Sequence, residues 1–513
     1  MHEDSKSLGP YWAAIAAPQP ASRPRLAEDL EADVVVIGGG IVGLTAAEAL
    51  ARMGKSVVVL EALRIGTQAT GRSTAKISAQ HGLAYSRLVR DFDEQAARVY
   101  GQANQGAIDH IETLVERGRI ACGIERKSAY AYAHSADAVE AVKDEASVVA
   151  RLGLPAQLTR DIPAPVPASL ALRFDNQAQF NPVQYLAGLA DMIAPSARLF
   201  EMTRVEAIHK TSDGRSCRVL VEGGHHVDAS DVIVATHLPM VSEGMLYAKA
   251  YPFSHPLLAG RIDPDRAPDG MFISVDSPSR SFRTDASGDT LHLVAVGASY
   301  ATGDTNGEAQ SLGELEEFVR SHFGMGASDW RWTNMDFRSM DGLPFIGPAS
   351  TSAPQVHVAT GFNAWGITNG TLAGTLLADQ VAGRKNPYSA LFDPGRPKRF
   401  AAGAEFVKAN AGNARHLVGD RLRVRRQHDL DLQPGQATVA TLDGDSVAAY
   451  RDDAGVLHAV SAVCTHMGCI VGWNATDRSW DCPCHGSRFA PDGAVLHGPA
   501  VTPLKEVSLA GRD

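Results

Sequence analysis

The feature that most restricts the fold of this 513-residue chain is a cluster of four of its six cysteines near the C-terminus. They lie with two histidines in two short boxes, Cys464-Thr-His466-Met-Gly-Cys469 and Cys482-Pro-Cys484-His485-Gly-Ser487. The boxes can present two thiolates and two imidazoles, from Cys464, His466, Cys482 and His485, to one metal centre. Zinc accepts the same ligands, so the ligand count alone leaves a zinc site open beside an iron–sulfur site. The Cys-x-His spacing on a tight loop, unlike the helix-borne histidines of zinc fingers, favours iron–sulfur.

The sequence around the boxes predicts a small antiparallel β domain. Beyond Gln433, short alternating runs such as ATVATL, VAAYRD and VLHAVSAV are separated by tight turns. We therefore expect an all-β domain over residues 429–513. Residues 396–428 are expected to form a linker or bridging helix between this domain and the rest of the chain.

Within such a domain, the two boxes resemble those of the Rieske family. The resemblance implies a [2Fe–2S] cluster, with Cys464 and Cys482 on the buried iron and His466 and His485 on the outer iron. Two neutral imidazoles in place of thiolates make the reduced cluster less negative. They thereby raise its potential to about −150 to +300 mV.

The resemblance also implies a disulfide between Cys469 and Cys484, which occupy matching places in the two boxes. Ser487 resembles a hydroxyl donor of the respiratory type, in which donors to sulfur raise the potential further. High-potential members carry a tyrosine where this chain has Phe489, so one donor is missing. We therefore expect an intermediate potential.

A second motif, near the N-terminus, predicts a dinucleotide site. The apolar run Asp33–Ile37 leads into Gly38-x-Gly40-x-x-Gly43 and then into a helical pattern at Leu44–Met53. The glycines permit a tight turn, a close approach of the backbone to a pyrophosphate, and close packing of helix against strand. A second strand, Ser56–Leu60, ends at Glu61, whose carboxylate is placed to accept hydrogen bonds from ribose hydroxyls.

Several stretches of the first 395 residues resemble the D-amino-acid oxidase-like superfamily of FAD oxidoreductases. Besides the opening motif, the likeness rests on Gly71-Arg-Ser, on the strand 231–236, and on the stretches 342–347 and 359–370. In that superfamily the last stretch places a helix N-terminus at the flavin O2/N1 edge, where it stabilises the negative charge of reduced flavin. The resemblance implies FAD held without a covalent link, since no cysteine lies near these motifs and no histidine takes the place of a histidyl link. It assigns to the cofactor Gly38, Gly40, Ile41, Val42, Gly43, Glu61, Ala62, Arg72, Ser73, Thr74, Val205, Ala235, Thr236, Gly342, Gly347, Gly361, Phe362, Gly366 and Ile367.

The fold class expected from these motifs is an α/β FAD-binding Rossmann-type body with an α+β substrate domain, plus a small all-β Rieske domain. Residues 1–30, rich in Pro, Ala and Ser, are expected to form a surface arm, and residues 31–395 the body. Its FAD-binding parts are expected at 31–85, 175–240 and 335–395, and its substrate-domain parts at 86–174 and 241–334.

The candidate catalytic residues are Lys76 and Arg338. Lys76, like Arg72, follows the second strand near the expected isoalloxazine, and binding to FAD phosphate or to a nearby carboxylate explains both residues equally well. Arg338 precedes Asp341-Gly342, near where relatives that oxidise amino acids hold the substrate carboxylate, although the register differs. Flavin oxidation of amines mostly requires positioning of the substrate, with little side-chain acid–base work.

Other classes of protein are disfavoured by what the sequence lacks. The formal charge of −10 argues against nucleic acid or an anionic membrane as the main partner. No secretory signal and no apolar run of about 20 residues is found, so we expect a cytoplasmic protein without a membrane span. A second dinucleotide fingerprint is missing, which disfavours reduction by NAD(P)H. A two-histidine–carboxylate triad is missing as well, which disfavours an oxygenase.

The function expected is an FAD-dependent dehydrogenase that oxidises a small organic substrate, an amine or amino acid. It would pass electrons singly from FAD to the Rieske cluster and on to an external acceptor. Two alternatives remain open. A donor could feed electrons through the cluster to a flavin that reduces a substrate, or the two centres could serve a redox sensor or electron-transfer protein without turnover.

Overall fold

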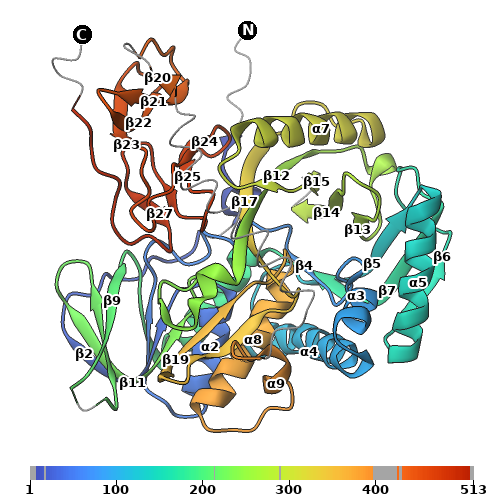
Figure 1. The fold of residues 1–513 in the computed structure, drawn as a ribbon. Coiled ribbons are helices and arrows are strands. Elements are labelled where there is room, and N and C mark those ends of the chain that lie inside the picture. The colour runs from blue at the N-terminus through green and yellow to red at the C-terminus, as the bar shows by residue number, and fades with distance from the viewer. Residues whose placement is uncertain are drawn as a thin grey trace.

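The computed structural model describes residues 7–16, 19–212, 214–287, 290–396, 425–426 and 430–508. The chain forms a large body built on two sheets, with a small β domain against one side of it (Figure 1). This confirms the predicted α/β body and all-β C-terminal domain. Within the described ranges, no helix is long and apolar enough to cross a membrane. The predicted linker at 396–428 lies outside the described residues, except for Arg396 and Arg425–Arg426.

The first sheet carries the predicted dinucleotide fold. Its parallel strands run in the order β19-β11-β2-β3-β8, with β18 antiparallel beside β19 and with β10 joining β9 to β11. Runs such as Val34–Ile37 are buried because helices cover parallel strands, which are therefore apolar on both faces. The strands are β2 (Leu30–Ile37), β3 (Val57–Leu60), β8 (Ala197–Phe200), β9 (Val205–Lys210), β10 (Cys217–Val221), β11 (His226–Val234), β18 (Phe345–Ser350) and β19 (Ala353–Thr360).

Two helices that pack against each other, α2 (Ile41–Arg52) and α8 (Gly366–Val381), lie on this sheet (Figure 1). They approach closely because Gly374 has no side chain: a Cβ there would lie 2.6 Å from the Cβ of Thr45. Each helix follows the carboxyl end of a parallel strand, α2 after β2 and α8 after β19. Both helix N-termini therefore point to the same edge of the sheet, where ligands of such folds bind.

The second sheet has eleven strands and forms the other half of the body. Its order is β1-β17-β12-β15-β14-β13-β5-β7-β4, with β16 on β12 and β6 on β7. The strands are β1 (Ser7–Leu8), β4 (Lys76–Ile77), β5 (Glu125–Ala133), β6 (Ala156–Thr159), β7 (Leu170–Gln179), β12 (Ala250–Arg261), β13 (Met271–Ser274), β14 (Ser281–Ser287), β15 (Thr290–Val296), β16 (Tyr300–Ala301) and β17 (Trp330–Ser339). The other helices of the body are α1 (Tyr11–Ile15), α3 (Ala84–Asp91), α4 (Glu94–Gly118), α5 (Ala136–Leu152), α6 (Pro182–Ile193), η1 (Glu243–Ala248), η2 (Pro264–Arg266), α7 (Thr305–Phe323) and α9 (Ser389–Phe392).

The N-terminal arm is more deeply embedded than predicted. Tyr11 and Trp12 are fully buried, and β1 pairs with β17. The Trp12 indole donates to the carbonyl of Ser73 (2.7 Å), and its ring lies 4.6 Å from the Arg283 guanidinium. The expectation of a surface arm is therefore wrong at these two residues, because large aromatic side chains gain far more from burial than the surrounding small residues do.

The C-terminal domain is built from two small four-stranded sheets. One has the order β20-β21-β22-β23 and the other β24-β25-β26-β27. Trp480 and Phe489 are completely buried in the core beneath the second sheet. The strands are β20 (Arg425–Arg426), β21 (Ala437–Leu442), β22 (Asp445–Arg451), β23 (Leu457–Ser461), β24 (Gly472–Asn474), β25 (Ser479–Asp481), β26 (Arg488–Phe489) and β27 (Val495–His497).

The β24–β25 hairpin holds this domain against the body. The two backbones nearly touch at Gly472, where a Cβ would lie 2.0 Å from the carbonyl oxygen of Gly303. At the start of α7, the Thr305 hydroxyl donates to the Trp473 carbonyl (2.7 Å). The Glu308 carboxylate accepts from the backbone N–H of Thr476 (2.9 Å). Docking therefore combines close backbone contact with satisfied buried polar groups.

A buried ion network crosses the same boundary. Asp477 pairs with Arg72 of the body and with Arg488 of its own domain, and all three side chains are at most 14% exposed. Thr333 of β17 donates from its hydroxyl to the Asp477 carboxylate. Arg488 also pairs with Asp481 (2.9 Å). The network balances two positive against two negative charges, as burial of ions requires.

Candidate functional site

A cavity of about 450 Å³ opens between the two sheets of the body. Its walls come from the Gly-rich turn after β2, the segment 66–76, the end of β11, strand β17 and the loop before α8. Residues 496–501 of the C-terminal domain line it as well. The carboxyl edge of the parallel sheet, where a dinucleotide is expected, is thus part of one continuous chamber.

The Gly-rich turn has the geometry that a pyrophosphate requires. Gly38 has a φ of 107°, and a Cβ there would lie 2.5 Å from the carbonyl oxygen of Ala235. A Cβ at Gly43 would lie 1.9 Å from the Gly38 carbonyl oxygen, so Gly43 serves close packing and does not line the cavity. Gly40 offers no side-chain cap to α2; the Thr70 hydroxyl accepts from the first N–H, that of Ile41 (3.3 Å), and the N–H groups of the next residues are left for an anion.

The Glu61 carboxylate stands at the end of β3, as predicted, and lines the cavity. It accepts hydrogen bonds from the backbone N–H groups of Gly39 (2.7 Å) and Leu63 (2.9 Å). Burial raises its pKa, and these two donors oppose the rise. Each oxygen keeps a further lone pair, so Glu61 can still accept from ribose hydroxyls.

Asp336 of β17 connects three parts of the cavity wall: its own strand, the segment after β11 and the loop before α8. Its Oδ1 accepts from the Phe337 N–H (2.7 Å) and lies 2.9 Å from Nε2 of His237, three residues beyond the end of β11. Its Oδ2 accepts from the N–H of Ala364 in the loop before α8. Asp336, together with the Asn363 side chain that donates to the Gly361 carbonyl (3.0 Å), therefore holds the loop before α8 in place.

Trp365, the last residue of that loop before α8, lines the cavity. Its ring stacks on His81 at 4.4 Å between ring centroids. His81 contacts the Tyr100 hydroxyl and the Ser78 carbonyl, both at 2.6 Å. Burial lowers the pKa of His81 to about 3, so the stacked imidazole is neutral. Trp365 is thereby held as a rigid wall.

Both predicted catalytic side chains line the cavity. The Lys76 ammonium donates to the Ser281 hydroxyl and lies 5.7 Å from the Trp365 ring centroid. Burial, followed by the positive charge of Arg283, lowers its pKa to about 7. The Arg338 guanidinium lies over the Phe253 ring at 4.7 Å, and no described carboxylate is within ion-pair distance of it. Lys76 and Arg338 therefore both lack an acidic partner among the described residues, and Arg338 is exposed.

Of the cofactor residues predicted from the sequence, fourteen line this cavity and five do not. Those that line it are Gly38, Gly40, Ile41, Val42, Glu61, Ala62, Ser73, Thr74, Val205, Ala235, Thr236, Phe362, Gly366 and Ile367. The others are Gly43, Arg72, Gly342, Gly347 and Gly361.

Each of the five has other neighbours in the structure. Gly342, Gly347 and Gly361 all have positive φ, and a Cβ there would lie 2.2 Å from Arg87, 3.0 Å from Pro394 and 3.0 Å from Ser339, respectively. They shape the backbone behind the cavity wall. Arg72 donates to the Thr333 carbonyl (2.9 Å) and to Asp477, and so faces the C-terminal domain.

The four predicted cluster ligands come together on two loops of the C-terminal domain. The thiols of Cys464 and Cys482 and the imidazole of His485 are buried. The Nδ1 atoms of His466 and His485 are buried without a hydrogen-bond partner among the described residues, which is expected of nitrogens that bind a metal. Burial lowers the pKa of His466 and lowers that of His485 to about 4, so both are the neutral imidazoles that metals bind.

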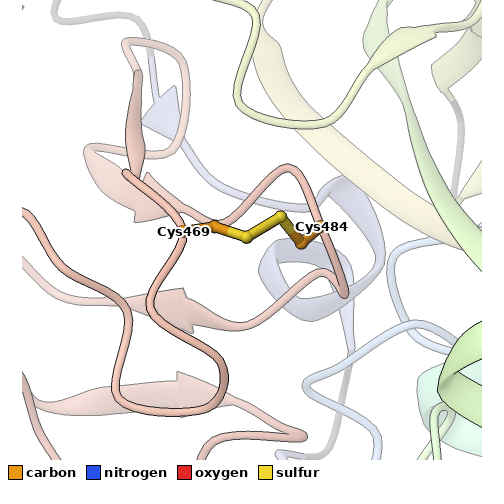
Figure 2. Close-up of a disulfide and its surroundings, with 2 residues drawn as sticks. All are labelled: Cys469 and Cys484. Atoms are coloured by element: carbon orange, nitrogen blue, oxygen red, sulfur yellow. A yellow bond between two sulfur atoms is a disulfide. The ribbon is translucent and has the colours of Figure 1, made fainter. Parts of the chain in front are cut away.

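A disulfide joins the two loops, between Cys469 and Cys484 (Figure 2). The sulfur atoms of both lie within 4.8 Å of that of Cys482. Because the disulfide occupies Cys469 and Cys484, the free thiols left for the cluster are those of Cys464 and Cys482. Two thiols and two imidazoles with free ring nitrogens fit a [2Fe–2S] group of the Rieske type.

The histidine side of the cluster site faces the body, with His485 buried and His466 partly exposed. The Tyr247 ring of η1 meets His485 and His466 edge to face, at 5.7 and 6.5 Å between centroids. A Cβ at Gly486 would lie 2.6 Å from Met335 and 3.0 Å from Phe337, both on β17. The cluster loops therefore rest on one face of β17, while the cavity is lined mainly from the other face, with Met335 in contact with both.

Several residues at the site escaped prediction from the sequence. His237, Asp336 and Tyr247 belong to no motif, and His497 comes from the other domain. They reach the site through contacts between distant parts of the chain, for which a single sequence carries no local signal.

Comparison with protein families gives two matches. Residues 33–380 match the family DAO, FAD dependent oxidoreductase, and residues 421–508 match the Rieske [2Fe-2S] domain. The chain is 38% identical over 491 residues to the Rieske 2Fe-2S iron-sulfur protein YhfW of Bacillus subtilis (strain 168), covering 95% of this chain and 96% of that protein.

Two solved structures share the fold of the body. Glycine oxidase from Geobacillus kaustophilus aligns with a TM-score of 0.60 at 19% identity, over 72% of this chain and all of the other. L-proline dehydrogenase from P. horikoshii aligns with a TM-score of 0.59 at 18% identity, over 72% of this chain and 98% of the other. At these identities the likeness concerns the fold alone.

Proposed function

The chain belongs to the DAO family of FAD-dependent oxidoreductases and carries a C-terminal Rieske [2Fe–2S] domain. From this we propose that it is a dehydrogenase that oxidises a small amine or amino acid and passes electrons singly from FAD to the cluster. We also propose the predicted domain limits, with the body at 31–395 and the Rieske domain at 429–513, and the predicted cofactor residues that line the cavity.

The observation that carries this proposal is the position of β17 between the two sites. Asn334, Asp336 and Arg338 line the cavity, whereas Thr333 and Phe337 face the Rieske domain. Met335 contacts both. A single strand therefore separates the cavity from the cluster loops, which favours direct electron transfer within the chain.

When bound, FAD takes up two electrons from a substrate, and the cluster carries one electron at a time. The residues between the two sites keep them close and dry. Phe337 is fully buried and Met335 nearly so, and Tyr247 covers the histidine ligands. Exclusion of water at these contacts supports electron transfer along this route and limits side reactions at the two centres.

The polar groups of the cavity support a substrate that carries a carboxylate. Arg338 offers a guanidinium without an acidic partner, held over Phe253, and a guanidinium binds a carboxylate through two parallel hydrogen bonds. Lys76, whose pKa lies near 7, stands beside Trp365 and can orient an amino group. The names of the two structural relatives, an oxidase of glycine and a dehydrogenase of L-proline, suggest amino acids as the first compounds to test.

The test is anaerobic reduction of the holoenzyme with a panel of amino acids and amines that includes glycine and L-proline. The expected result is bleaching of the flavin absorbance, followed by the EPR signal of a reduced Rieske cluster. A substrate that bleaches the flavin fully while the cluster stays EPR-silent would refute the electron relay.

The direction of electron flow is tested separately by measuring both midpoint potentials. We expect the midpoint potential of the cluster to lie above that of the flavin, because electrons move toward the centre of higher potential. A cluster below the flavin would favour a reductase fed through the Rieske domain. Failure of every amine and amino acid to bleach the flavin would favour a redox sensor without turnover.

A further inference from the structure

We propose that the Rieske domain supplies part of the FAD site itself, with His497 as a ligand to the polar middle of the cofactor, so that FAD binding and docking of this domain are coupled. This holds whichever way electrons flow and whatever the substrate is. The Rieske domain would then have two binding roles: it would hold the cluster, which needs no flavin, and it would hold part of FAD.

The first support is the shape of the cavity. Residues 496–501, which begin within β27 and continue beyond it, line the same chamber as Gly38 and Gly40 of the phosphate turn. The segment is held there from the body, because the Arg204 guanidinium donates to the Val495 carbonyl (2.6 Å). Arg204 lines the cavity too. Without the Rieske domain, this side of the FAD chamber would be open.

The second support is a pair of imidazoles that face each other across the domain boundary. The rings of His497 and His237 lie 5.3 Å apart at an angle of 76°. Nε2 of His497 and Nδ1 of His237 are both buried without a hydrogen-bond partner among the described residues. Buried polar nitrogens are normally satisfied, so two orphans beside one cavity indicate a missing ligand with polar atoms.

The position of this pair indicates which part of FAD it meets. The N–H of Ala235 donates to the Ile37 carbonyl (2.8 Å), one residue before the phosphate turn. His237 follows Ala235 by two residues, so it lies beside the turn that is built for a pyrophosphate. A neutral imidazole offers one donor and one acceptor, which suits phosphate and ribityl oxygens.

The charges around His497 also favour an anion. Burial is the main cause that lowers the pKa of His497, and the nearby groups that lower it further are His237, Arg488, Arg204 and Arg72. Arg72 and Arg488 are balanced by Asp477 and Asp481. Arg204 is in no ion pair among the described residues, so its positive charge is the one that a pyrophosphate beside the neutral imidazole would meet.

The third support is a mechanical link on the opposite wall. Ala69, Thr70 and Ser73 line the cavity, and Arg72 in the same segment pairs with Asp477 of the Rieske domain. The hydroxyl of Thr70 also accepts from the N–H of Ile41, at the start of α2 (3.3 Å). Docking of the Rieske domain therefore orders the loop that borders the phosphate turn, as well as closing the chamber.

The experiment measures FAD affinity in the full chain, without substrate or turnover. The protein is stripped of FAD with its cluster retained, and FAD is titrated back while the quenching of its fluorescence is recorded. We expect His497→Ala to weaken FAD binding about 10-fold or more, since a lost hydrogen bond to a charged group has an effect of this order. The EPR signal of the cluster should stay unchanged.

His458→Ala is the matched control. His458 is a half-buried histidine of the same domain that pairs with Asp452 (3.0 Å), and it does not line the cavity. Its replacement should leave FAD affinity within twofold of the parent. An equally small effect of His497→Ala, with an intact cluster signal, would overturn the assignment of His497.

A second variant keeps the test decisive if His497→Ala loses its cluster. Asp477→Asn leaves every cavity-lining residue in place but removes the ion pair with Arg72. We expect this variant to bind FAD more weakly. By linkage, saturation with FAD should then raise the temperature at which the cluster bleaches by less than it does in the parent protein. If FAD does not shift that temperature even in the parent protein, the coupling is refuted. A failed substrate screen would leave both results untouched.

Discussion

At the scale of single residues, the cavity is distinguished by cations that the protein leaves without acidic partners. Arg338 rests on Phe253 and Lys76 on a hydroxyl, whereas Arg72, Arg488 and Arg396 all pair with carboxylates. A cation partly withdrawn from water, as Lys76 is, is costly unless something negative joins it, and the exposed Arg338 guanidinium is free to bind an anion. The two lining residues therefore hold the charge that an anionic substrate would neutralise.

Replacement of Arg338 tests that role. Arg338→Ala should weaken binding of an amino acid substrate about 10- to 100-fold, because a charge-assisted hydrogen-bond pair to the carboxylate is lost. The dissociation constant is obtained from the substrate dependence of anaerobic flavin bleaching. The matching amine without a carboxylate should bind both forms almost equally, and an equal loss for both compounds would contradict a carboxylate contact.

Lys76 gives a prediction for stability against pH. Its pKa of about 7 in the folded chain lies below its ordinary value of 10.5, so between these two values the unfolded chain binds the extra proton. Stability should therefore rise with pH over that window, by at most about 1.4 kcal/mol per pH unit from this group. Denaturant unfolding at pH 7 to 10 should show a smaller rise for Lys76→Met, and the same slope in both proteins would contradict a shifted Lys76.

At the scale of elements, β17 and η1 form the partition between the cavity and the cluster. β17 supplies Asp336 to one side and Phe337 to the other, as alternation along a strand dictates. η1 adds Tyr247 over the histidine ligands. The environment of the cluster is thus partly determined by the body and not only by its own domain.

Opening this partition should change the cluster potential. Tyr247→Ala should admit water to the histidine edge and stabilise the more negative, reduced cluster, which raises its midpoint potential on the order of tens of millivolts. Redox titration followed by EPR measures the shift. Tyr247→Phe keeps the ring and serves as the control, and a potential shifted equally by both variants would point to the hydroxyl instead.

Prediction from the sequence works for residues within one strand–turn–helix unit and fails for residues that meet across distant elements. Gly38, Gly40 and Glu61 could be predicted because a strand, turn and helix that are contiguous in sequence create their geometry. Arg72 received a cofactor role from its motif, yet its partner Asp477 lies 405 positions away. No local pattern encodes such a partner, and the same holds for His497 and Tyr247.

At the scale of the whole molecule, the Rieske domain is built into the body by its β24–β25 hairpin. The hairpin connects the two cluster loops, so the contacts at Gly472 and Asp477 anchor the cluster itself. The first sheet of the domain, β20 to β23, lies farther out (Figure 1). This arrangement supports a cluster at a fixed position relative to the flavin cavity.

Gly472 tests the docking as a whole. Gly472→Ala should force the two backbones apart, because its Cβ would lie 2.0 Å from the Gly303 carbonyl oxygen, and should lower stability by several kcal/mol, on the order of an overpacked core. Thermal bleaching of the cluster absorbance monitors the loss. Gly313→Ala in α7, where nothing lies within 4 Å of the added Cβ, should be neutral or slightly stabilising. If the parent protein, Gly472→Ala and Gly313→Ala all lost the cluster absorbance at the same temperature, tight docking would be contradicted.

The two-sided use of β17 also restricts how this chain can vary over evolution. Because successive side chains of a strand alternate between faces, insertion or deletion of one residue before Thr333 would turn over every side chain from there to Arg338. The cavity would receive Phe337 in place of Asp336, and the cluster loops would meet carboxylate and guanidinium groups. Residue identities along this strand can drift, but its length and phase cannot. In distant relatives that keep both redox groups, we expect gaps in an alignment to fall on either side of this segment and never within it.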